Sequence, residues 1–208
     1  MINPEIKNRL IKAVKNPLPG LKSHKKMMPD NRIGNAKNNR PPHKSAVLLL
    51  LFPDKTDLKL IFIKRTQNES IHSGQTAFPG GKFEKTDINL KNTALREAKE
   101  EINVNPDKIT VIKELTPLYI PVSNFNVHPF VGISETKPRL KASKNEVDRI
   151  FTAKLSKLFE IKPVSKIINV RNNIINAPFF IFDEFEVWGA SAMILNEFID
   201  LTKPEFLK

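Results

Sequence analysis

The sequence predicts an α/β domain in which a mixed central sheet lies between helices. Three observations support this fold class. The apolar run SAVLLLLF at 45–52 is typical of a central strand that is buried on both faces. The segment LKLIFIK at 58–64 follows a short polar turn and predicts the returning strand. Apolar residues recur at helical spacing within 90–102 and 189–201, so two long helices are expected, the second of which closes the chain.

The chain before the first strand is expected to form a basic N-terminal helix and arm at 1–44, ahead of the main domain at 45–208. A helical stripe predicts a helix over 2–14, formed by Ile6, Leu10, Ile11 and Val14. Residues 20–44 are polar and contain several prolines, which favours an extended arm. We expect this arm to pack on the domain through Met27 and Met28.

The later elements follow from local pattern. Thr86 or Asp87 is the expected entry to the first long helix. Residues 118–126 contain a proline and are expected to form a loop, and Pro129 favours an edge strand or a bulge. The remaining strands are expected at 109–117, 127–134 and 166–170, with a hairpin at 179–182 and 185–188.

Composition limits the class of protein. An apolar fraction of 40% is enough for a packed core, and no apolar run is long enough to cross a membrane. The N-terminus lacks the apolar core of a signal peptide, and the absence of cysteine excludes disulfides and thiol catalysis. A cytoplasmic protein is therefore expected.

The net charge of +12 raises the question of nucleic-acid binding. Residues 1–44 carry most of the excess, with eleven Lys and Arg against Glu5 and Asp30, and the rest of the chain is nearly balanced. A low-GC genome would also produce the observed bias towards Lys, Asn and Ile. Nucleic acid is thus an unlikely partner, whereas a basic surface suits a polyanionic small molecule.

One helix carries a group of acids. Within 90–102, Glu97 shares a helical face with Glu100 and Glu101, and the opposite face can be buried through Leu95, Ala98 and Ile102. Most acidic faces are simply solvated. Here, however, the double-glycine turn FPGG at 78–81 and two further acids, Glu84 and Asp87, precede the helix. This arrangement favours a hard divalent cation that also binds a phosphate.

These residues resemble the box of the Nudix hydrolases, G-x5-E-x7-R-E-U-x-E-E-x-G-U. Gly81 opens it, Asp87 stands at the first acidic position, and REAKEEINV at 96–104 closes it. The chain departs from the box in three ways. Asp replaces Glu at 87, one extra residue precedes Arg96, and Asn103 replaces the late Gly. Asn tolerates the left-handed conformation better than most residues.

The resemblance extends to the coenzyme A diphosphatase branch, over roughly residues 45–200. That branch shares the longer box, the wording TALREAxEE and an upstream GQxxFPGG, but it has an Arg where this chain has Ser70. The resemblance implies a Nudix-type α/β/α sandwich and a requirement for Mg²⁺ or Mn²⁺.

The same resemblance implies roles for the acids. Glu97 and Glu101 would bind the metal together with Glu100, and Arg96 would orient these carboxylates. The general base would be Glu100 or the remote Glu146, which lies in an EVxxIF segment. Two residues, Glu84 and Asp87, would touch the metal through water or help to start the helix.

Substrate contacts are expected on and before the double-glycine loop. Cationic, hydrogen-bonding or glycine positions there are candidates to hold a phosphate, with Lys64 and Gln75 beside them: Arg65, His72, Gly74, Phe78, Gly80 and Gly81. Three aromatic residues either stack on adenine or belong to the core: Tyr119, Phe125 and Trp188.

The expected activity is metal-dependent hydrolysis of the diphosphate bond of coenzyme A or a derivative, giving 3′,5′-ADP and phosphopantetheine. One alternative is a Nudix hydrolase acting on ADP-ribose, NADH or another dinucleotide-like diphosphate. A second is a binding module whose residues 1–44 contact RNA or an acidic partner. The expected partner is a nucleotide-containing small molecule and not a membrane, and the sequence is compatible with an oligomer.

Overall fold

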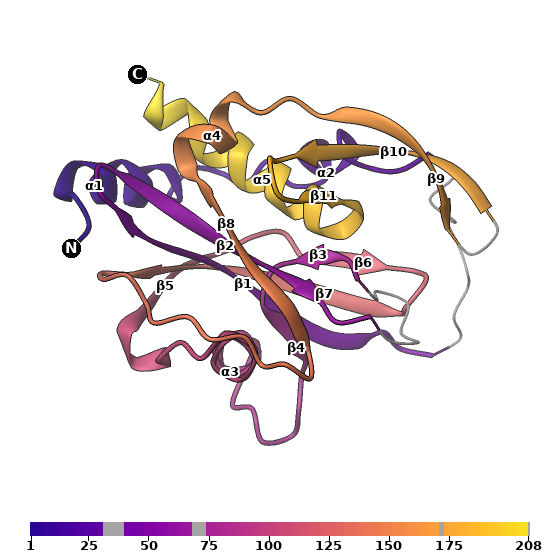
Figure 1. The fold of residues 1–208 in the computed structure, drawn as a ribbon, viewed down its shortest axis with the longest axis horizontal. Coiled ribbons are helices and arrows are strands. Elements are labelled where there is room, and N and C mark those ends of the chain that lie inside the picture. The colour runs from indigo at the N-terminus through magenta and orange to yellow at the C-terminus, as the bar shows by residue number, and fades with distance from the viewer. Residues whose placement is uncertain (31–39, 68–73, 171–172, 208) are drawn as a thin grey trace.

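A mixed sheet organises the chain (Figure 1). The computed structural model describes residues 1–30, 40–67, 74–170 and 173–207. Its helices are α1 (Pro4–Ala13), α2 (Leu21–Lys25), α3 (Leu90–Ile102), η1 (Pro106–Lys108), α4 (Leu155–Glu160) and α5 (Gly189–Phe206). Its strands are β1 (His43–Asp54), β2 (Asp57–Arg65), β3 (Thr76–Ala77), β4 (Gly80–Lys82), β5 (Ile109–Glu114), β6 (Leu118–Ile120), β7 (Phe125–Ser134), β8 (Val147–Lys154), β9 (Val164–Val170), β10 (Asn173–Ile181) and β11 (Glu186–Trp188).

The main sheet confirms the mixed topology that the sequence predicts. Its strand order is β3-β2-β1-β7-β5, with β4 paired to β1, β6 to β7 and β8 to β2. The central strand β1 runs antiparallel to β2 and parallel to β7. Because successive side chains of a strand point to opposite faces, Leu49 and Leu51 enter one apolar cluster, whereas Leu48 and Leu50 enter another. The continuous apolar run is therefore buried on both sides.

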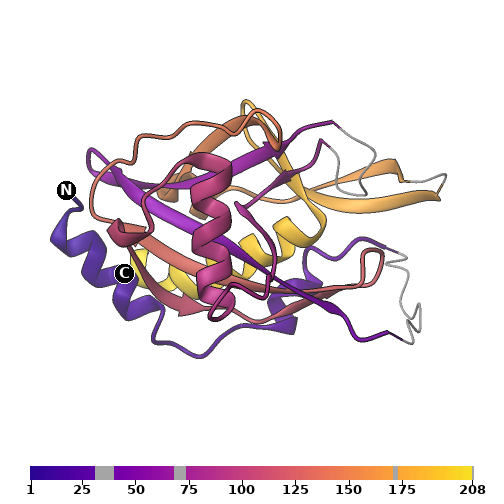
Figure 2. The same cartoon turned by 90° about the horizontal axis from the view of Figure 1, so that it is seen from below.

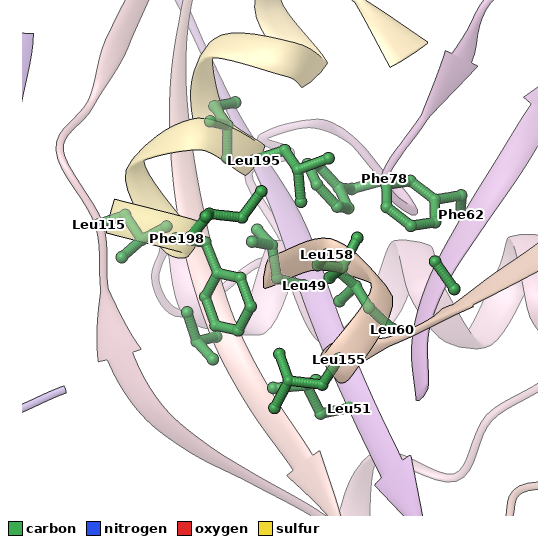
Figure 3. Close-up of a cluster of buried hydrophobic side chains, with 14 of the residues drawn as sticks. Leu49, Leu51, Leu60, Phe62, Phe78, Leu115, Leu155, Leu158, Leu195 and Phe198 are labelled. Atoms are coloured by element: carbon green, nitrogen blue, oxygen red, sulfur yellow. The ribbon is translucent and has the colours of Figure 1, made fainter. Parts of the chain in front are cut away.

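Helices cover both faces and complete the α/β/α arrangement (Figures 1 and 2). On one face α3 packs through Ala94, Ala98 and Ile102. On the other face α4 and α5 enclose the larger cluster, to which α5 contributes Leu195 and Phe198 (Figure 3). The acidic helix is thus held on a rigid sheet by its small and apolar face.

The N-terminal segment packs against α5. The predicted N-terminal helix is confirmed as α1, and Leu10 is fully buried in the larger cluster. Met27 is also fully buried there, and Met28 packs against it, as expected. The expectation of an extended arm is wrong for residues 21–25, which form α2.

A buried polar network joins α2 to α5. The imidazole Nε2 of His24 lies 2.9 Å from Oε2 of Glu197, and both side chains are almost fully buried. The same carboxylate accepts hydrogen bonds from the Thr116 hydroxyl at 2.6 Å and from the Gly20 N–H at 3.1 Å. Glu197 therefore ties the arm and Thr116, in the segment between β5 and β6, to the closing helix.

Three local expectations need correction. The first long helix is capped by Asn89 and not by Thr86 or Asp87, because the Asn89 side chain accepts from the Asn92 N–H at 3.0 Å. The expected loop at 118–126 contains β6 and the start of β7. Pro129 does not lie on an edge strand, since β7 pairs with β1 on one side and with β5 and β6 on the other, and the irregularity in the β5–β7 pairing lies at residues 111–113 of β5.

The reason that Pro129 is tolerated is visible in the pairing. β6 pairs with residues 125–127 of β7, and β5 pairs with residues 130–134, so Pro129 lies between the two partners. Its carbonyl accepts from the Leu115 N–H, and the N–H that proline lacks is not needed at this gap.

The chain closes with a smaller sheet in the order β11-β10-β9. The predicted hairpin at 179–188 is confirmed by the pairing of Phe179 with Trp188. Among the described residues no helix is long and apolar enough to span a membrane.

Candidate active site

The site is built on α3, whose bounds coincide with the predicted ones. Asn89 caps its first turn, and Asn103 ends it in the left-handed conformation with φ of 59°. The structure thus places Asn103 in the conformation that the expected glycine of the box would adopt. The loop after β7 then covers the last turn, because the N–H groups of Lys141 and Ser143 donate to the carbonyls of Ile102 and Glu101.

Glu101 is buried between the helix and the double-glycine strand. Its side chain is only 2% exposed, and its Oε2 accepts the Gly80 N–H at 2.8 Å. The guanidinium of Arg65 lies 3.9 Å from Oε1 and donates to the Gly80 carbonyl at 3.0 Å. Both backbone polar groups of Gly80 are therefore used to fix the position of Glu101.

The two glycines are required by close approach. A Cβ at Gly80, where φ is 154°, would lie 2.3 Å from the Ala46 carbonyl oxygen. A Cβ at Gly81 would lie 2.4 Å from Oε1 of Glu97. The missing side chains let β4 pair with β1 and bring its backbone against the carboxylate of Glu97.

Arg96 holds the other acids of the helix. Its Nε and Nη2 donate to the two oxygens of Asp87 at 2.9 and 3.1 Å. Its Nη1 lies 2.9 Å from Glu100 and 3.1 Å from Glu97. A single guanidinium thus connects the turn before the helix to two of its three glutamates.

Asp87 is held as a structural anion. The guanidinium of Arg96 keeps the pKa of this carboxyl at about 2, although burial acts in the opposite direction. Asp87 also accepts from the Glu84 N–H and from the Thr93 hydroxyl. The side chain of Glu84 is exposed and only its backbone takes part in this network.

Glu97 and Glu101 are both disfavoured as anions in the absence of a cation. Burial raises the pKa of Glu101 to about 7, which the Arg65 charge and the Gly80 hydrogen bond only partly oppose. Burial also raises the pKa of Glu97, against the opposing effect of Arg96. Glu146 adds negative charge to both sites. Two neighbouring carboxylates therefore have less positive charge around them than they need.

Glu146 lies immediately before β8 and is exposed. Its carbonyl accepts the Thr66 N–H, and its own N–H donates to Ser143 in the loop that covers the end of α3. This turn brings Glu146, which is distant from the box in the sequence, close to the end of α3. Ser143 makes the link, because its N–H donates to the Glu101 carbonyl and its carbonyl accepts from the Glu146 N–H.

The predicted substrate contacts divide into several groups. The expectation that Phe78 contacts the substrate is wrong. Its side chain is only 1% exposed, and its ring centroid lies 5.1 Å from that of Phe62 in the core (Figure 3). Gly80 is buried, and its N–H and carbonyl are already bonded within the protein. Gly74 and Gly81 remain partly exposed, and His72 lies outside the described residues.

The three aromatic candidates for stacking have protein partners. Trp188 stacks on Phe179 with ring centroids 5.6 Å apart. The Phe125 ring lies 5.5 Å from the His43 ring, and the Tyr119 hydroxyl donates to the Asn124 side chain. These contacts favour structural roles for the three rings.

Sequence reasoning missed a basic pocket beside the box. A cavity of about 440 Å³ is lined by Arg40, Pro41, Pro42, His43, Lys44, Lys82 and Phe83. The basic residues were visible only as part of a charged arm, and nothing in their spacing indicated that β4 would bring Lys82 beside Lys44.

The donor set fits a hard divalent cation. Carboxylate oxygens are suitable ligands, and burial, with a smaller contribution from neighbouring carboxylates, raises the pKa of both Glu97 and Glu101. Within the described ranges, no three His, Asp or Glu side chains are already arranged to hold a metal ion. Glu97 and Glu100 instead contact the guanidinium of Arg96.

Comparisons with known proteins agree with this geometry. Residues 42–169 match the NUDIX domain model. The chain is 32% identical over 162 residues to an uncharacterized Nudix hydrolase, NudL, of Pectobacterium atrosepticum, and the match covers 76% of this chain and 83% of that protein. A NudL protein of Salmonella paratyphi B is 34% identical over 139 residues, covering 66% and 72% of the two chains.

One solved structure supports the fold. The MutT protein from Methanosarcina mazei Go1 superposes with a TM-score of 0.50 at 18% sequence identity, covering 77% of this chain and 94% of that one. This likeness concerns the fold alone. The domain match and the relatives show that the chain belongs to the Nudix hydrolase family, enzymes that hydrolyse nucleoside diphosphate derivatives with the help of divalent metal ions.

Proposed function

We propose that this hydrolase cleaves the diphosphate bond of coenzyme A or one of its derivatives, giving 3′,5′-ADP and phosphopantetheine. The observation that carries the hydrolytic part is the pair of carboxylates, half-buried Glu97 and buried Glu101, held beside Gly80 and Gly81. The choice of coenzyme A rests on the segment from Gly74 to Gly81, whose GQxxFPGG pattern resembles that branch of the family.

Glu97 and Glu101 are the proposed ligands of Mg²⁺ or Mn²⁺, and Glu100 is a third. When bound, the ion neutralises charge on the diphosphate and makes a water molecule more acidic. The chain fixes Glu101 through the Gly80 N–H and Arg65. It fixes Glu97 and Glu100 through Arg96, so the carboxylates are oriented before the substrate arrives.

Glu146 is the better candidate for the general base. Glu100 is tied to Arg96 at 2.9 Å, whereas no side-chain hydrogen bond or ion pair of Glu146 occurs within the described part of the chain. Glu146 would accept a proton from the water that attacks one phosphorus, and the P–O bond to the other phosphate would break. Arg65, at the edge of the site, would stabilise charge on the phosphate oxygens.

The test is a comparison of coenzyme A with ADP-ribose and NADH as substrates, each with Mg²⁺ and with Mn²⁺. The proposal expects the highest kcat/KM for coenzyme A and products that contain 3′,5′-ADP. Faster hydrolysis of ADP-ribose or NADH would support the alternative substrate class and refute the choice of coenzyme A.

A second discriminating measurement uses Glu146→Gln and Glu100→Gln. Loss of the proton acceptor lowers kcat and removes its dependence on pH on the acidic side. We expect both the lower kcat and the loss of this pH dependence for Glu146→Gln. The same loss in the variant of Glu100 alone would assign the base to the helix instead.

A further inference from the structure

The basic pocket beside the box has no role in the hydrolytic step. It lies where the start of β1 meets the end of β4, and the Phe83 N–H donates to the Lys44 carbonyl at 3.0 Å. Its lining contains no acid, and Arg40, Lys44 and Lys82 form no ion pair within the described residues. Three cations around one cavity without a counter-charge favour an anionic ligand.

The pocket adjoins the acidic site through two neighbouring residues. Lys82 lines the pocket, and the preceding Gly81 lies against the carboxylate of Glu97. The carbonyl of Lys82 also accepts from Nη2 of Arg96 at 3.1 Å. The backbone of Lys82 thus contacts Arg96 of the acidic site while Lys82 also lines the pocket, so the two sites meet at the end of β4.

The remaining walls suit a nucleoside. Pro41, Pro42, Phe83 and His43 give the cavity apolar and ring surfaces. The His43 ring is supported by Phe125 at 5.5 Å, and the Pro41 carbonyl accepts from the Asn124 side chain. A cavity of about 440 Å³ falls within the range of small-molecule sites, roughly 300–1,000 Å³.

We infer that this pocket binds the 3′-phosphorylated adenosine end of the substrate, with Arg40 and Lys44 holding the phosphate monoester. The inference rests on the proposed function and adds a reason for its specificity. Arg forms paired hydrogen bonds with phosphate oxygens, and Lys adds a point charge. A nucleotide without the additional phosphate would leave both cations unpaired.

The first test measures binding and needs no catalysis. Adenosine 3′,5′-bisphosphate and adenosine 5′-monophosphate are titrated into wild-type protein and into the double variant Arg40→Ala/Lys44→Ala. We expect wild type to bind the bisphosphate about tenfold more tightly, as one charge-assisted contact implies, and the double variant to lose this preference. Equal binding of the two nucleotides by wild type, or a preference that survives in the variant, would overturn the inference.

A control variant that removes the same number of positive charges tests whether net charge alone explains the preference for the bisphosphate. Lys22→Ala/Lys162→Ala removes two exposed lysines that do not line the pocket, and it should retain the preference for the bisphosphate. Loss of the preference in this control would assign it to net charge and also overturn the inference.

The second test separates the pocket from the proposed function. The ratio of kcat/KM for coenzyme A to that for dephospho-coenzyme A should fall about tenfold in the Arg40→Ala/Lys44→Ala variant. If coenzyme A is hydrolysed and this ratio is near one in wild type, the pocket inference fails while the proposed function stands. If coenzyme A is not hydrolysed but the bisphosphate preference depends on Arg40 and Lys44, the proposed function fails and the pocket stands.

Discussion

Two buried glutamates on two helices have opposite electrostatic environments. Glu101 on α3 and Glu197 on α5 are both almost inaccessible to solvent. Burial raises the pKa of Glu101 to about 7. Burial acts in the same direction on Glu197, but hydrogen bonds from His24, Thr116 and Gly20 outweigh it and hold the pKa below its ordinary value.

The difference separates a structural anion from a candidate functional one. Glu197 accepts from several donors and has His24 at 2.9 Å, so its charge is balanced within the fold. Glu101 has one backbone donor at 2.8 Å and a guanidinium at 3.9 Å, with Glu97 and Glu146 adding negative charge. A buried carboxylate that the protein leaves short of positive charge is suited to a ligand that brings it.

The largest effect should separate the two glutamates by activity. Glu101→Gln removes a proposed metal ligand, so kcat/KM should fall by at least about a hundredfold. Glu197→Gln lies outside the proposed site and should retain its activity per folded molecule. Steady-state kinetics with Mg²⁺ at pH 8 measures both. Near-normal activity of the Glu101 variant would remove it from the site.

The same two substitutions should change stability in opposite directions. Glu197→Gln places an amide N–H₂ group where N–H and O–H donors already converge, and should cost about 2 kcal/mol of the free energy of unfolding. Glu101→Gln removes a poorly compensated buried charge and should stabilise the metal-free protein at pH 8. Urea unfolding in the presence of EDTA measures both changes. Destabilisation of similar size in both variants would contradict the contrast.

The pH dependence of stability tests the raised pKa of Glu101 separately. The folded pKa of Glu101, about 7, lies above the ordinary value of 4.5 for a glutamate. Between these values the folded state keeps a proton that the unfolded state has lost, so metal-free stability falls as pH rises from about 5 to 7. Over this pH range Glu101 lowers the free energy of unfolding by about 2 kcal/mol. Wild type minus Glu101→Gln, measured by urea unfolding from pH 5 to 8, should show that fall, and a flat difference would contradict it.

The smallest effect concerns the guanidinium that links the acids. Lysine at position 96 cannot donate to both oxygens of Asp87 and also reach Glu97 and Glu100. Arg96→Lys should therefore lower kcat/KM about tenfold. Arg9→Lys alters an exposed pair with Glu5 and serves as the matched control, with no expected change. Equal activities of the two variants would show that the geometry of Arg96 is not needed.

The sequence predicted the parts that depend on local pattern. The bounds of α3, the pair of central strands and the closing hairpin follow from periodicity and turn residues. The box also identified Glu97, Glu100 and Glu101 as a group. Short elements such as β6, and the accommodation of Pro129 inside the sheet, depend on which strands become neighbours.

The contrast between the two glutamates could not be predicted in this way. His24 and Glu197 are 173 residues apart, and no local pattern indicates that they meet. Glu101 likewise acquires its environment from Gly80 and Arg65, which come from strands of the main sheet. In the sequence both residues are glutamates on amphipathic helices, and only the tertiary structure shows that their partners differ.

Titration of Mn²⁺ at pH 8 tests the central claim most directly. Wild type and Glu197→Gln are expected to bind the ion with similar affinity, whereas Glu97→Gln/Glu101→Gln should bind it at least about a hundredfold more weakly. Circular dichroism of the same samples confirms that the double variant is folded. If that folded double variant bound Mn²⁺ as tightly as wild type, the carboxylates of Glu97 and Glu101 would not be the metal site.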